Sequence, residues 1–218
     1  MRNFKKTLSF LLSTVIIVSS VAGVGTTVFA ATDEHTYKNF KYRILDDNTA
    51  EICGYTGKNA VVTVPDSIDS KPVTSIGRTA FYSGKIKEVT IPNTVKNIKW
   101  WAFYGCESLE KINLNFGLKT VGYGAFMNCK NLKSVSIPMS VTQICDDSFA
   151  VSCSTKKGVF DTYSKQTIST QQYSTDSLFT LEGYSGTVAE KYCNDNSLNF
   201  VSLGNVIYGD VNNNGTVE

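Results

Sequence analysis

Two consecutive segments decide the fold of the chain: IKWWAFYGCESLEKINLNFGL from Ile98 to Leu118, and VGYGAFMNCKNLKSVSIPMSV from Val121 to Val141. Each begins with an aliphatic residue that precedes the alanine of an Ala-Phe pair by four residues. This spacing occurs four times, and the aliphatic residues are Ile76, Ile98, Val121 and Ile144, at steps of 22, 23 and 23 residues. Other apolar positions keep the period: Ile86, Leu109, Leu132; Val89, Ile112, Val135; Ile91, Leu114, Ile137; Val95, Leu118, Val141. A fixed period of this size indicates a solenoid, whose units bury their apolar sides only against their neighbours.

Each unit also predicts one short, half-buried strand. Ile112 and Leu114 are apolar and alternate with the polar Lys111 and Asn113, which is the pattern of a strand with one buried face. Stacked units would place these strands side by side, about 5 Å apart, in a parallel ladder. The outward positions should then form two columns, which are Glu88, Lys111, Ser134 and Thr90, Asn113, Ser136.

The units resemble the BspA-like leucine-rich repeats of bacterial surface and secreted proteins, whose pattern is I-x-x-x-A-F-x-x-C-x-x-L-x-x-V-x-I-P-x-x-V. The first quoted segment departs from it at Asn115, where proline is usual, and the second follows it with proline present. The last unit departs further, since Ser148 replaces alanine and Cys153 lies one residue late. The resemblance implies a β-rich solenoid, a right-handed leucine-rich-repeat coil with a parallel strand ladder, and places the repeats at 74–155.

Both ends of the predicted solenoid carry segments suited to cover it. Residues 31–73 form a lead and an N-terminal cap, in which apolar residues alternate on both sides of Asp46–Thr49 as in a β-hairpin. Residues 178–203 resemble the C-terminal cap of the same family. There we expect a strand from Phe179, a helix over Thr187–Asn196 that threonine can cap, and a last strand near Phe200. Val188, Ala189, Tyr192 and Cys193 should share one face of the helix.

The polar segment 156–177 interrupts the period between the repeats and the C-terminal cap. It is rich in Ser, Thr, Gln, Tyr and Lys and has few apolar residues. A long insertion of this kind is either functional or evidence against the assignment of the elements around it. Two interpretations stay open, a binding arm and a degenerate extra turn of the solenoid.

Residues 1–30 have the pattern of a secretory signal peptide. A basic start is followed by a largely apolar run and by Val28-Phe29-Ala30, which supplies small residues before a cleavage point. A membrane anchor is the alternative, but serines interrupt the run and no basic stop-transfer cluster follows it. We therefore expect a secreted protein, extracellular or on the bacterial cell surface, without a membrane span after signal removal.

Removal of the signal also changes the charge. The whole chain has 21 basic and 19 acidic residues, and the signal holds three of the basic and none of the acidic ones, which leaves 18 against 19 and a formal charge of −1. A nearly neutral chain lacks the basic footprint that nucleic-acid binding requires, so we expect no nucleic-acid partner.

The last segment, 204–218, predicts a linker and an incomplete calcium loop. Asp210, Asn212 and Asn214 alternate, Gly215 stands sixth, and the carbonyl of Thr216 would be the seventh-position ligand. The run resembles the opening of a type I dockerin, which docks onto a cohesin in cellulosome-type assemblies. The twelfth-position carboxylate and the second loop are missing, so calcium is expected only where a longer chain completes the dockerin. A polar tail that binds nothing is the alternative.

The residues of the chain argue against an enzyme. The single histidine, His35, lies in a segment expected to be mobile, whereas a Ser-His-Asp or Cys-His arrangement or a histidine-based zinc site needs a rigidly held one. Asp46-Asp47 and Asp146-Asp147 are adjacent pairs, which are more typical of solvated turns than of a glycosidase cleft. We therefore expect no catalytic residues and no enzymatic activity.

Cysteine usage gives no redox or metal site, because no C-x-x-C occurs. Cys106 and Cys129 stand one repeat apart, so stacking would bring them within disulfide range. The cysteine of these repeats also serves as a small buried apolar residue, which leaves a disulfide and two free thiols as alternatives. The other four, Cys53, Cys145, Cys153 and Cys193, cannot be paired from the sequence.

Four aromatic residues predict a ligand-binding stripe outside the core columns: Trp100, Trp101, Tyr104 and Tyr123. Exposed flat rings bind sugars or protein partners through a large apolar face with a polar edge. Alternatively, the stripe packs beneath the insertion 156–177.

Two functional hypotheses follow. The first is a secreted, non-catalytic binding or adhesion protein with a surface glycan or protein as ligand, attached through the dockerin to cohesin in a cellulosome-type assembly. The second is a scaffold or spacer part of a larger secreted polysaccharide-degrading enzyme or peptidase. Repeat surfaces vary their exposed positions while the core stays the same, so the ligand itself is not encoded in the period.

Overall fold

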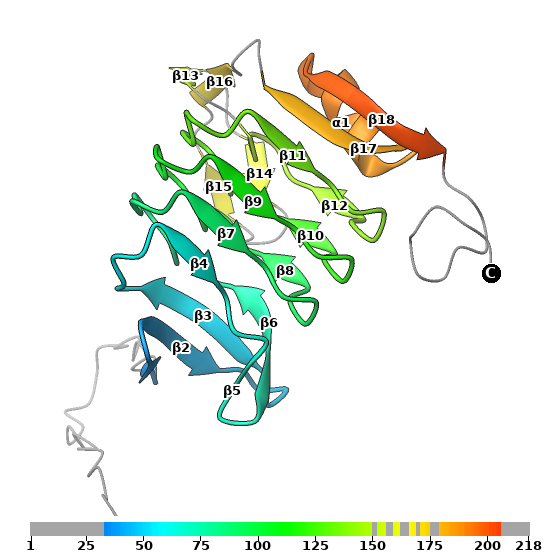
Figure 1. Cartoon of the computed structure of the whole chain (residues 1–218). Helices are drawn as coiled ribbons and strands as arrows, with labels where there is room; N and C mark the ends of the chain where they lie inside the picture. The colour runs from blue at the N-terminus through cyan, green and yellow to red at the C-terminus, as the bar shows by residue number, and fades with distance from the viewer. Residues whose placement is uncertain are drawn as a thin grey trace, which may run out of the picture. The chain divides into compact units, whose positions relative to one another are not determined.

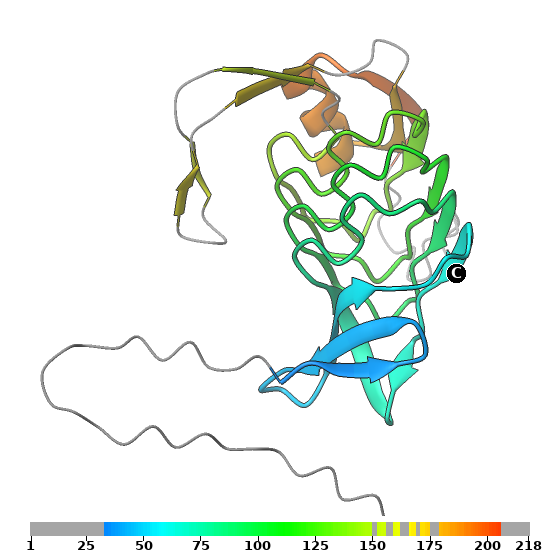
Figure 2. The same ribbon diagram turned by 90° about the vertical axis from the view of Figure 1, so that its left-hand side faces the viewer.

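The computed structural model describes residues 33–149 and 179–205, and between them the backbone of four short strands. The described residues wind into a β-solenoid in which successive turns stack on one another (Figures 1 and 2). This confirms the predicted fold class. The predicted signal 1–30 and the predicted calcium loop lie outside the described residues.

The first ladder is the one that the repeat pattern predicts. Strands β4 (Val61–Thr63), β7 (Glu88–Thr90) and β9 (Lys111–Asn113) pair in parallel, with Val89 beside Ile112. The next turns continue the same side of the solenoid with β11 (Ser134–Ser136) and β17 (Thr180–Ser185), also parallel (Figure 1). The outer columns follow the prediction here, because Lys111 forms an ion pair with Glu88 at 3.1 Å.

A second parallel ladder, which the repeat pattern did not predict, is formed by short strands that follow each strand of the first ladder. Its strands are β6 (Lys71–Ile76), β8 (Asn97–Ile98), β10 (Thr120–Val121) and β12 (Gln143–Ile144). The aliphatic residues that define the repeat pair directly, Ile76 with Ile98, Ile98 with Val121, and Val121 with Ile144. Three of the four are almost fully buried, and Ile144 packs against the same core. Two residues per turn suffice for a ladder because the neighbouring turn supplies the hydrogen-bonding partners.

The phenylalanines of the Ala-Phe pairs form one continuous stack inside the solenoid. Ring centroids are 4.8 Å apart from Phe81 to Phe103, and 5.2 Å apart from Phe103 to Phe126 and from Phe126 to Phe149. The interplanar angles of these three pairs are 10° or less. Phe179 of the C-terminal cap extends the stack at 5.4 Å. Backbone hydrogen bonds join the same corners of the turns, since Phe103 N–H donates to the Ala125 carbonyl at 2.8 Å.

The repeat cysteines are free thiols in the core. Cys106 Sγ donates to the Phe81 carbonyl at 2.9 Å, and Cys129 Sγ donates to the Phe103 carbonyl at 3.2 Å. Each thiol therefore serves as a small apolar residue and as a donor to the turn before it. Of the two alternatives that the sequence left open, the structure shows the free thiols.

In one turn, Asn115 stands at the position where proline is usual and stabilises the turn in its place. Its side-chain Oδ1 accepts from Gly117 N–H at 2.5 Å, and its Nδ2 donates to the Val95 carbonyl at 3.3 Å. The side chain thus fixes the turn by hydrogen bonds where Pro92 and Pro138 fix it by their rings. Leu118 N–H donates to the Asn115 carbonyl at 3.2 Å, as Val95 N–H does to the Pro92 carbonyl at 3.1 Å.

The N-terminal cap is the predicted hairpin. Strands β2 (Phe40–Ile44) and β3 (Ala50–Tyr55) pair antiparallel, β1 (His35–Tyr37) pairs with β2, and β3 joins β6 in parallel. A further short strand, β5 (Ser67–Ile68), pairs antiparallel with β6. The hairpin thereby extends the second ladder and gives its first turn a partner (Figure 1).

The C-terminal cap contains β17, helix α1 (Val188–Asn196) and β18 (Asn199–Asn205), and β18 pairs in parallel with β17. The predicted helix face is confirmed, because Ala189, Tyr192 and Cys193 are buried and Val188 packs against the core. The predicted threonine cap is wrong in one respect. Thr187 stands at the N-cap position, but its hydroxyl donates to the Tyr184 carbonyl at 2.6 Å, and Glu190 accepts from Gly186 N–H at 2.8 Å instead.

The predicted insertion 156–177, together with the last residues of the segment predicted as repeats, contains two antiparallel strand pairs. Strand β13 (Ser152–Thr155) pairs with β16 (Gln171–Ser174), and β14 (Val159–Asp161) pairs with β15 (Gln166–Ile168). Another turn of the solenoid would add parallel strands to the ladders, so this pairing differs from that of the repeats.

We predict that Phe126→Ala lowers the free energy of unfolding by about 3–5 kcal/mol, because the ring is buried between two others and its loss leaves a cavity. The matched control is Phe116→Ala, whose ring is 58% exposed and whose loss should cost less than about 1 kcal/mol. Urea unfolding followed by circular dichroism measures both values. Equal losses would show that the stack does not stabilise the solenoid.

Candidate binding surface

The corner that follows each strand of the second ladder carries the predicted aromatic residues. Trp100 and Trp101 follow β8 after one intervening residue, Lys99, and Tyr123 follows β10 one turn later. Ring centroids lie 5.5 Å apart for Trp100 and Trp101, 6.3 Å for Trp101 and Tyr104, and 6.4 Å for Trp101 and Tyr123. The structure therefore brings the four residues into one cluster outside the phenylalanine stack.

Two further residues belong to this surface, and sequence reasoning missed them. Tyr82 stacks on Tyr104 with centroids 5.4 Å apart and planes 6° apart. The guanidinium of Arg78 lies 4.3 Å from the ring centroid of Trp100 and 5.3 Å from that of Trp101, a cation–π arrangement. Both stand 22 residues before the ring that they contact, so alignment of the first unit with the second would have found them. We call the six residues the aromatic ridge: Arg78, Tyr82, Trp100, Trp101, Tyr104 and Tyr123.

Burial divides the ridge into a base and an accessible top. Tyr123 is 7% exposed and packs with the fully buried Met127. Trp100, Trp101 and Tyr104 are partly buried, and Tyr82 is 57% exposed. Tyr123 therefore contributes mainly packing, while Tyr82 presents most of its ring to solvent.

Trp101 occupies an uncommon backbone conformation. Its φ is +56°, and the equivalent corners have the same left-handed value, with Thr79 and Gly124 at +56° and Asp147 at +55°. A bulky residue rarely adopts this region, so the surrounding contacts must hold it there. Gly124 makes that possible, since a Cβ at Gly124 would lie 2.7 Å from Trp101 Cδ1. Trp101 Nε1 is buried and has no hydrogen-bond partner among the described residues.

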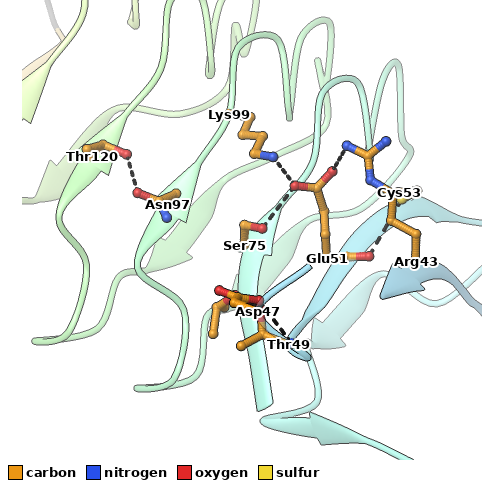
Figure 3. A network of polar contacts seen from close by, with 10 residues as sticks. Arg43, Asp47, Thr49, Glu51, Cys53, Ser75, Asn97, Lys99 and Thr120 are labelled. Carbon is orange, nitrogen blue, oxygen red and sulfur yellow. Dashed lines mark hydrogen bonds and ion pairs between the residues drawn. The ribbon is translucent and has the colours of Figure 1, made fainter. Parts of the chain in front are cut away.

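A buried acidic network lies between the hairpin and the first turns of the solenoid (Figure 3). The Glu51 side chain is 1% exposed and forms ion pairs with Arg43 and Lys99. Ser75 Oγ donates to Glu51 Oε2 at 3.0 Å, and in the next turns Thr120 Oγ1 donates to Asn97 Oδ1 at 2.9 Å. Because Lys99 follows β8 and Arg43 lies in β2, the carboxylate joins four strands. Both carboxylate oxygens of Glu51 have partners, so the role of the network is structural: it holds the hairpin against the first turns.

The adjacent aspartate pairs occupy turns, as their sequence pattern predicted. Asp47 is exposed, and it accepts from Thr49 N–H at 3.0 Å and from Thr49 Oγ1 at 2.6 Å; these bonds lower the pKa of its carboxyl. Asp147 stands at the left-handed corner, and burial raises the pKa of its carboxyl, an effect opposed by a hydrogen bond from Tyr123.

Burial raises the pKa of four of the described thiols. Burial raises the pKa of Cys106 to about 12 and those of Cys53 and Cys193 to about 11, and it raises the pKa of Cys129 well above its ordinary value. The thiolate is the nucleophilic and metal-binding form, so these residues stay protonated at neutral pH.

Metal ligands are not assembled in the part of the chain that the structure describes. No three residues among its His, Cys, Asp and Glu side chains converge on a common point. The predicted calcium ligands Asp210, Asn212, Asn214 and Thr216 lie outside the described residues. Within 33–149 and 179–205, no helix is both long enough and apolar enough to span a membrane.

Comparison with known proteins identifies the repeats. A model of the BspA type leucine-rich repeat region matches six copies over residues 62–199, which is more than half of the chain. The match extends on both sides of the four units recognised in the sequence, to β4 at one end and to the start of β18 at the other. No curated protein matches the chain.

Solved structures show the same similarity. A leucine-rich repeat protein from Bacteroides capillosus ATCC 29799 is 30% identical, over 52% of this chain and 88% of that one, with a TM-score of 0.50. The T. pallidum leucine-rich repeat protein is 29% identical over 53% of this chain and 66% of that one, with a TM-score of 0.45. A leucine-rich cell surface protein from Faecalibacterium prausnitzii A2-165 is 25% identical, over 71% of this chain and 46% of that one, with a TM-score of 0.47.

We predict that Glu51→Ala destabilises the fold by about 3–5 kcal/mol, because it leaves two cations without their buried partner. Glu110→Ala is the control, since Glu110 pairs with Lys87 at 2.9 Å on the exposed surface, where such pairs contribute less than about 1 kcal/mol. Chemical denaturation at neutral pH compares the two. A small loss for Glu51→Ala would mean that the hairpin docks without the network.

Proposed function

The chain belongs to the BspA-type leucine-rich repeat family, and from this premise we propose that it is a secreted, non-catalytic binding and adhesion module that holds a glycan chain on its aromatic ridge. Proteins of this family are typically surface or secreted bacterial proteins, and leucine-rich repeat proteins generally bind protein ligands, so the glycan part of the proposal rests on the aromatic ridge itself. The signal pattern of residues 1–30 supports export.

The stacked arrangement of Tyr82 on Tyr104 supports the ridge as the contact surface. Flat rings bury the C–H face of a sugar, while polar groups at the ring edges reach its hydroxyls. Here Asn128 Nδ2 donates to the Tyr104 hydroxyl at 3.2 Å, and the Arg78 guanidinium covers the indole of Trp100. The ridge spans successive turns of one solenoid, so its rings keep fixed spacings without any ordering on binding.

Attachment through the tail is a second part of the proposal. The run from Asp210 to Thr216 has the spacing of a calcium loop and resembles the opening of a type I dockerin. A polypeptide that completes this loop would be anchored to a cohesin in a cellulosome-type assembly. The alternative is a scaffold or spacer part of a larger secreted polysaccharide-degrading enzyme or peptidase, and a rigid histidine-bearing domain in a longer chain would favour it.

We predict that Tyr82→Ala and Trp100→Ala each weaken binding on a glycan array by roughly tenfold, because each removes one ring face worth about 1.4 kcal/mol. Phe116→Ala is the matched control, since its ring is 58% exposed, against 57% for Tyr82, and lies outside the ridge. Thermal unfolding should stay unchanged for Tyr82→Ala. Trp101→Ala should lower the melting temperature as well, because Trp101 packs over Gly124.

The result that would contradict the proposal is equal weakening by Phe116→Ala, or an array on which no glycan is retained. Capture of a defined protein by a ridge-dependent contact would replace the glycan with a protein ligand.

We predict that a polypeptide in which the calcium loop is complete is captured by a cohesin in a pull-down with millimolar calcium. Capture should fail in chelator, because oxygen ligands organise the loop only around the cation. Asp210→Ala should abolish the pull-down in calcium, whereas Asn205→Ala, before the loop, should leave it unchanged. Retention in chelator would remove the dockerin from the proposal and leave the ridge untouched.

A further inference from the structure

A pocket of about 320 Å³ lies between the N-terminal hairpin and the first Ala-Phe corner. Its walls come from the end of β3, the loop 56–59 and the corner that contains Tyr82. Tyr82 is shared with the aromatic ridge, so the pocket adjoins the surface on which the glycan is proposed to lie. The volume is at the lower end of small-molecule sites and suits about one or two sugar residues.

The pocket collects positive charge. Lys41, Lys58 and Lys85 line it, and Glu34 is its one lining carboxylate, so three positive and one negative charge leave a formal +2. None of the three lysines forms an ion pair with an acid in the described part of the chain. Unpaired cations that surround one concave site attract and hold an anion.

Three lysines elsewhere on the surface form ion pairs with glutamates. Lys87 pairs with Glu110 at 2.9 Å, Lys111 pairs with Glu88 at 3.1 Å, and Lys130 pairs with Glu107 at 2.6 Å. Each pair joins neighbouring turns, which is where the period places opposite charges side by side. Lys38 and Lys119, outside the pocket, likewise form no ion pair among the described residues, so what distinguishes the pocket is that three such lysines line one concave site.

Aromatic and alkyl groups give the pocket an apolar floor. The Tyr55 ring lies 5.6 Å from that of Phe81 and 5.1 Å from that of Phe40, at the N-terminal end of the phenylalanine stack, and its hydroxyl lies over Gly57, where any Cβ would collide with it. The alkyl stem of Lys41 packs on Gly54, since a Cβ there would meet Lys41 Cδ at 3.4 Å. Lysine stems of this kind cover apolar surface and leave the ammonium in solvent.

We propose that this pocket binds a carboxylated sugar residue of the glycan, of the hexuronic acid type. The rings of Tyr55 and Tyr82 contact its pyranose face, and the ammonium groups of Lys41, Lys58 and Lys85 receive its carboxylate. Lysine is a compact point charge that suits a single carboxylate, and the lining has no arginine fork or helix N-terminus of the kind that phosphate sites use. This assignment rests on the proposed glycan-binding function and names its substrate class.

The test uses the full chain and a panel of hexuronic acid oligosaccharides, each beside its carboxyl-reduced form. The variant is the triple substitution Lys41→Gln/Lys58→Gln/Lys85→Gln. The control is Lys87→Gln/Lys111→Gln/Lys130→Gln, which changes the net charge by the same amount at lysines outside the pocket. Titration calorimetry measures affinity, and thermal unfolding verifies that both variants are folded.

The proposal expects the wild type to prefer each acidic oligosaccharide over its reduced form by at least about tenfold, which is the value of one charge-assisted hydrogen bond. The pocket variant should lose this preference while it retains the affinity for the reduced form, and the control should keep the preference within about twofold. Equal affinity of the wild type for acidic and reduced forms overturns the pocket assignment, as does equal loss in both triple variants. If the reduced forms still bind and Trp100→Ala, a ridge substitution outside the pocket lining, weakens that binding by roughly tenfold, the ridge function stands without the pocket. If neither form binds, both proposals fall.

Discussion

Each turn of the solenoid must bury its inward side against the next turn, because no other part of the chain can cover it. The stack of Phe81, Phe103, Phe126 and Phe149 meets this requirement at one corner, with rings about as far apart as the backbones of paired strands. The two parallel strand ladders meet the same requirement for burial along the sides of each turn. Ring spacing and strand spacing agree, so packing and hydrogen bonding are satisfied together, in the 22-residue turn from Phe81 to Phe103 as in the 23-residue turns that follow.

The first and last turns of the stack each lack one neighbour, so other side-chain interactions must cover their exposed faces. At the N-terminal end, Glu51 is buried with Arg43 and Lys99, which ties the hairpin to the turns that follow. A buried carboxylate is costly to desolvate and is tolerated only when its partners are complete, so the network also fixes the register of the hairpin. At the C-terminal end, Phe179 continues the ring stack and Tyr192 of α1 meets Phe149 edge-on at 6.0 Å.

The sequence predicted the features that depend on period and polarity. The spacing of Ile98 and Val121 predicted the solenoid. The alternation of apolar and polar residues around Ile112 predicted the first ladder. The left-handed corner at Trp101 and the second ladder were not predicted, because period does not encode dihedral angles and a two-residue strand is too short to show alternation. The prediction that the Thr187 side chain caps the helix was wrong for a similar reason, since the hydroxyl can form its hydrogen bond either with the helix N-terminus or with the Tyr184 carbonyl. For the site, the sequence predicted four ridge residues. Arg78 was missed because it stands where the next unit has Trp100, and Tyr82 was missed although it stands at the position of Tyr104.

The ridge is physically separate from the interior that folds the chain. Tyr123 and Met127 form their own buried cluster, with Trp100, Trp101 and Tyr104 packed against it and apart from the main core. Exchange of an exposed residue such as Tyr82 therefore need not disturb the phenylalanine stack. Trp101 is the exception, because its backbone lies in the left-handed corner and its ring occupies the space above Gly124. Exposed residues at the top of the ridge can thus be substituted, and the ligand preference changed, without loss of the fold. Residues at its base cannot, because they lie at the left-handed corners at which the turns stack.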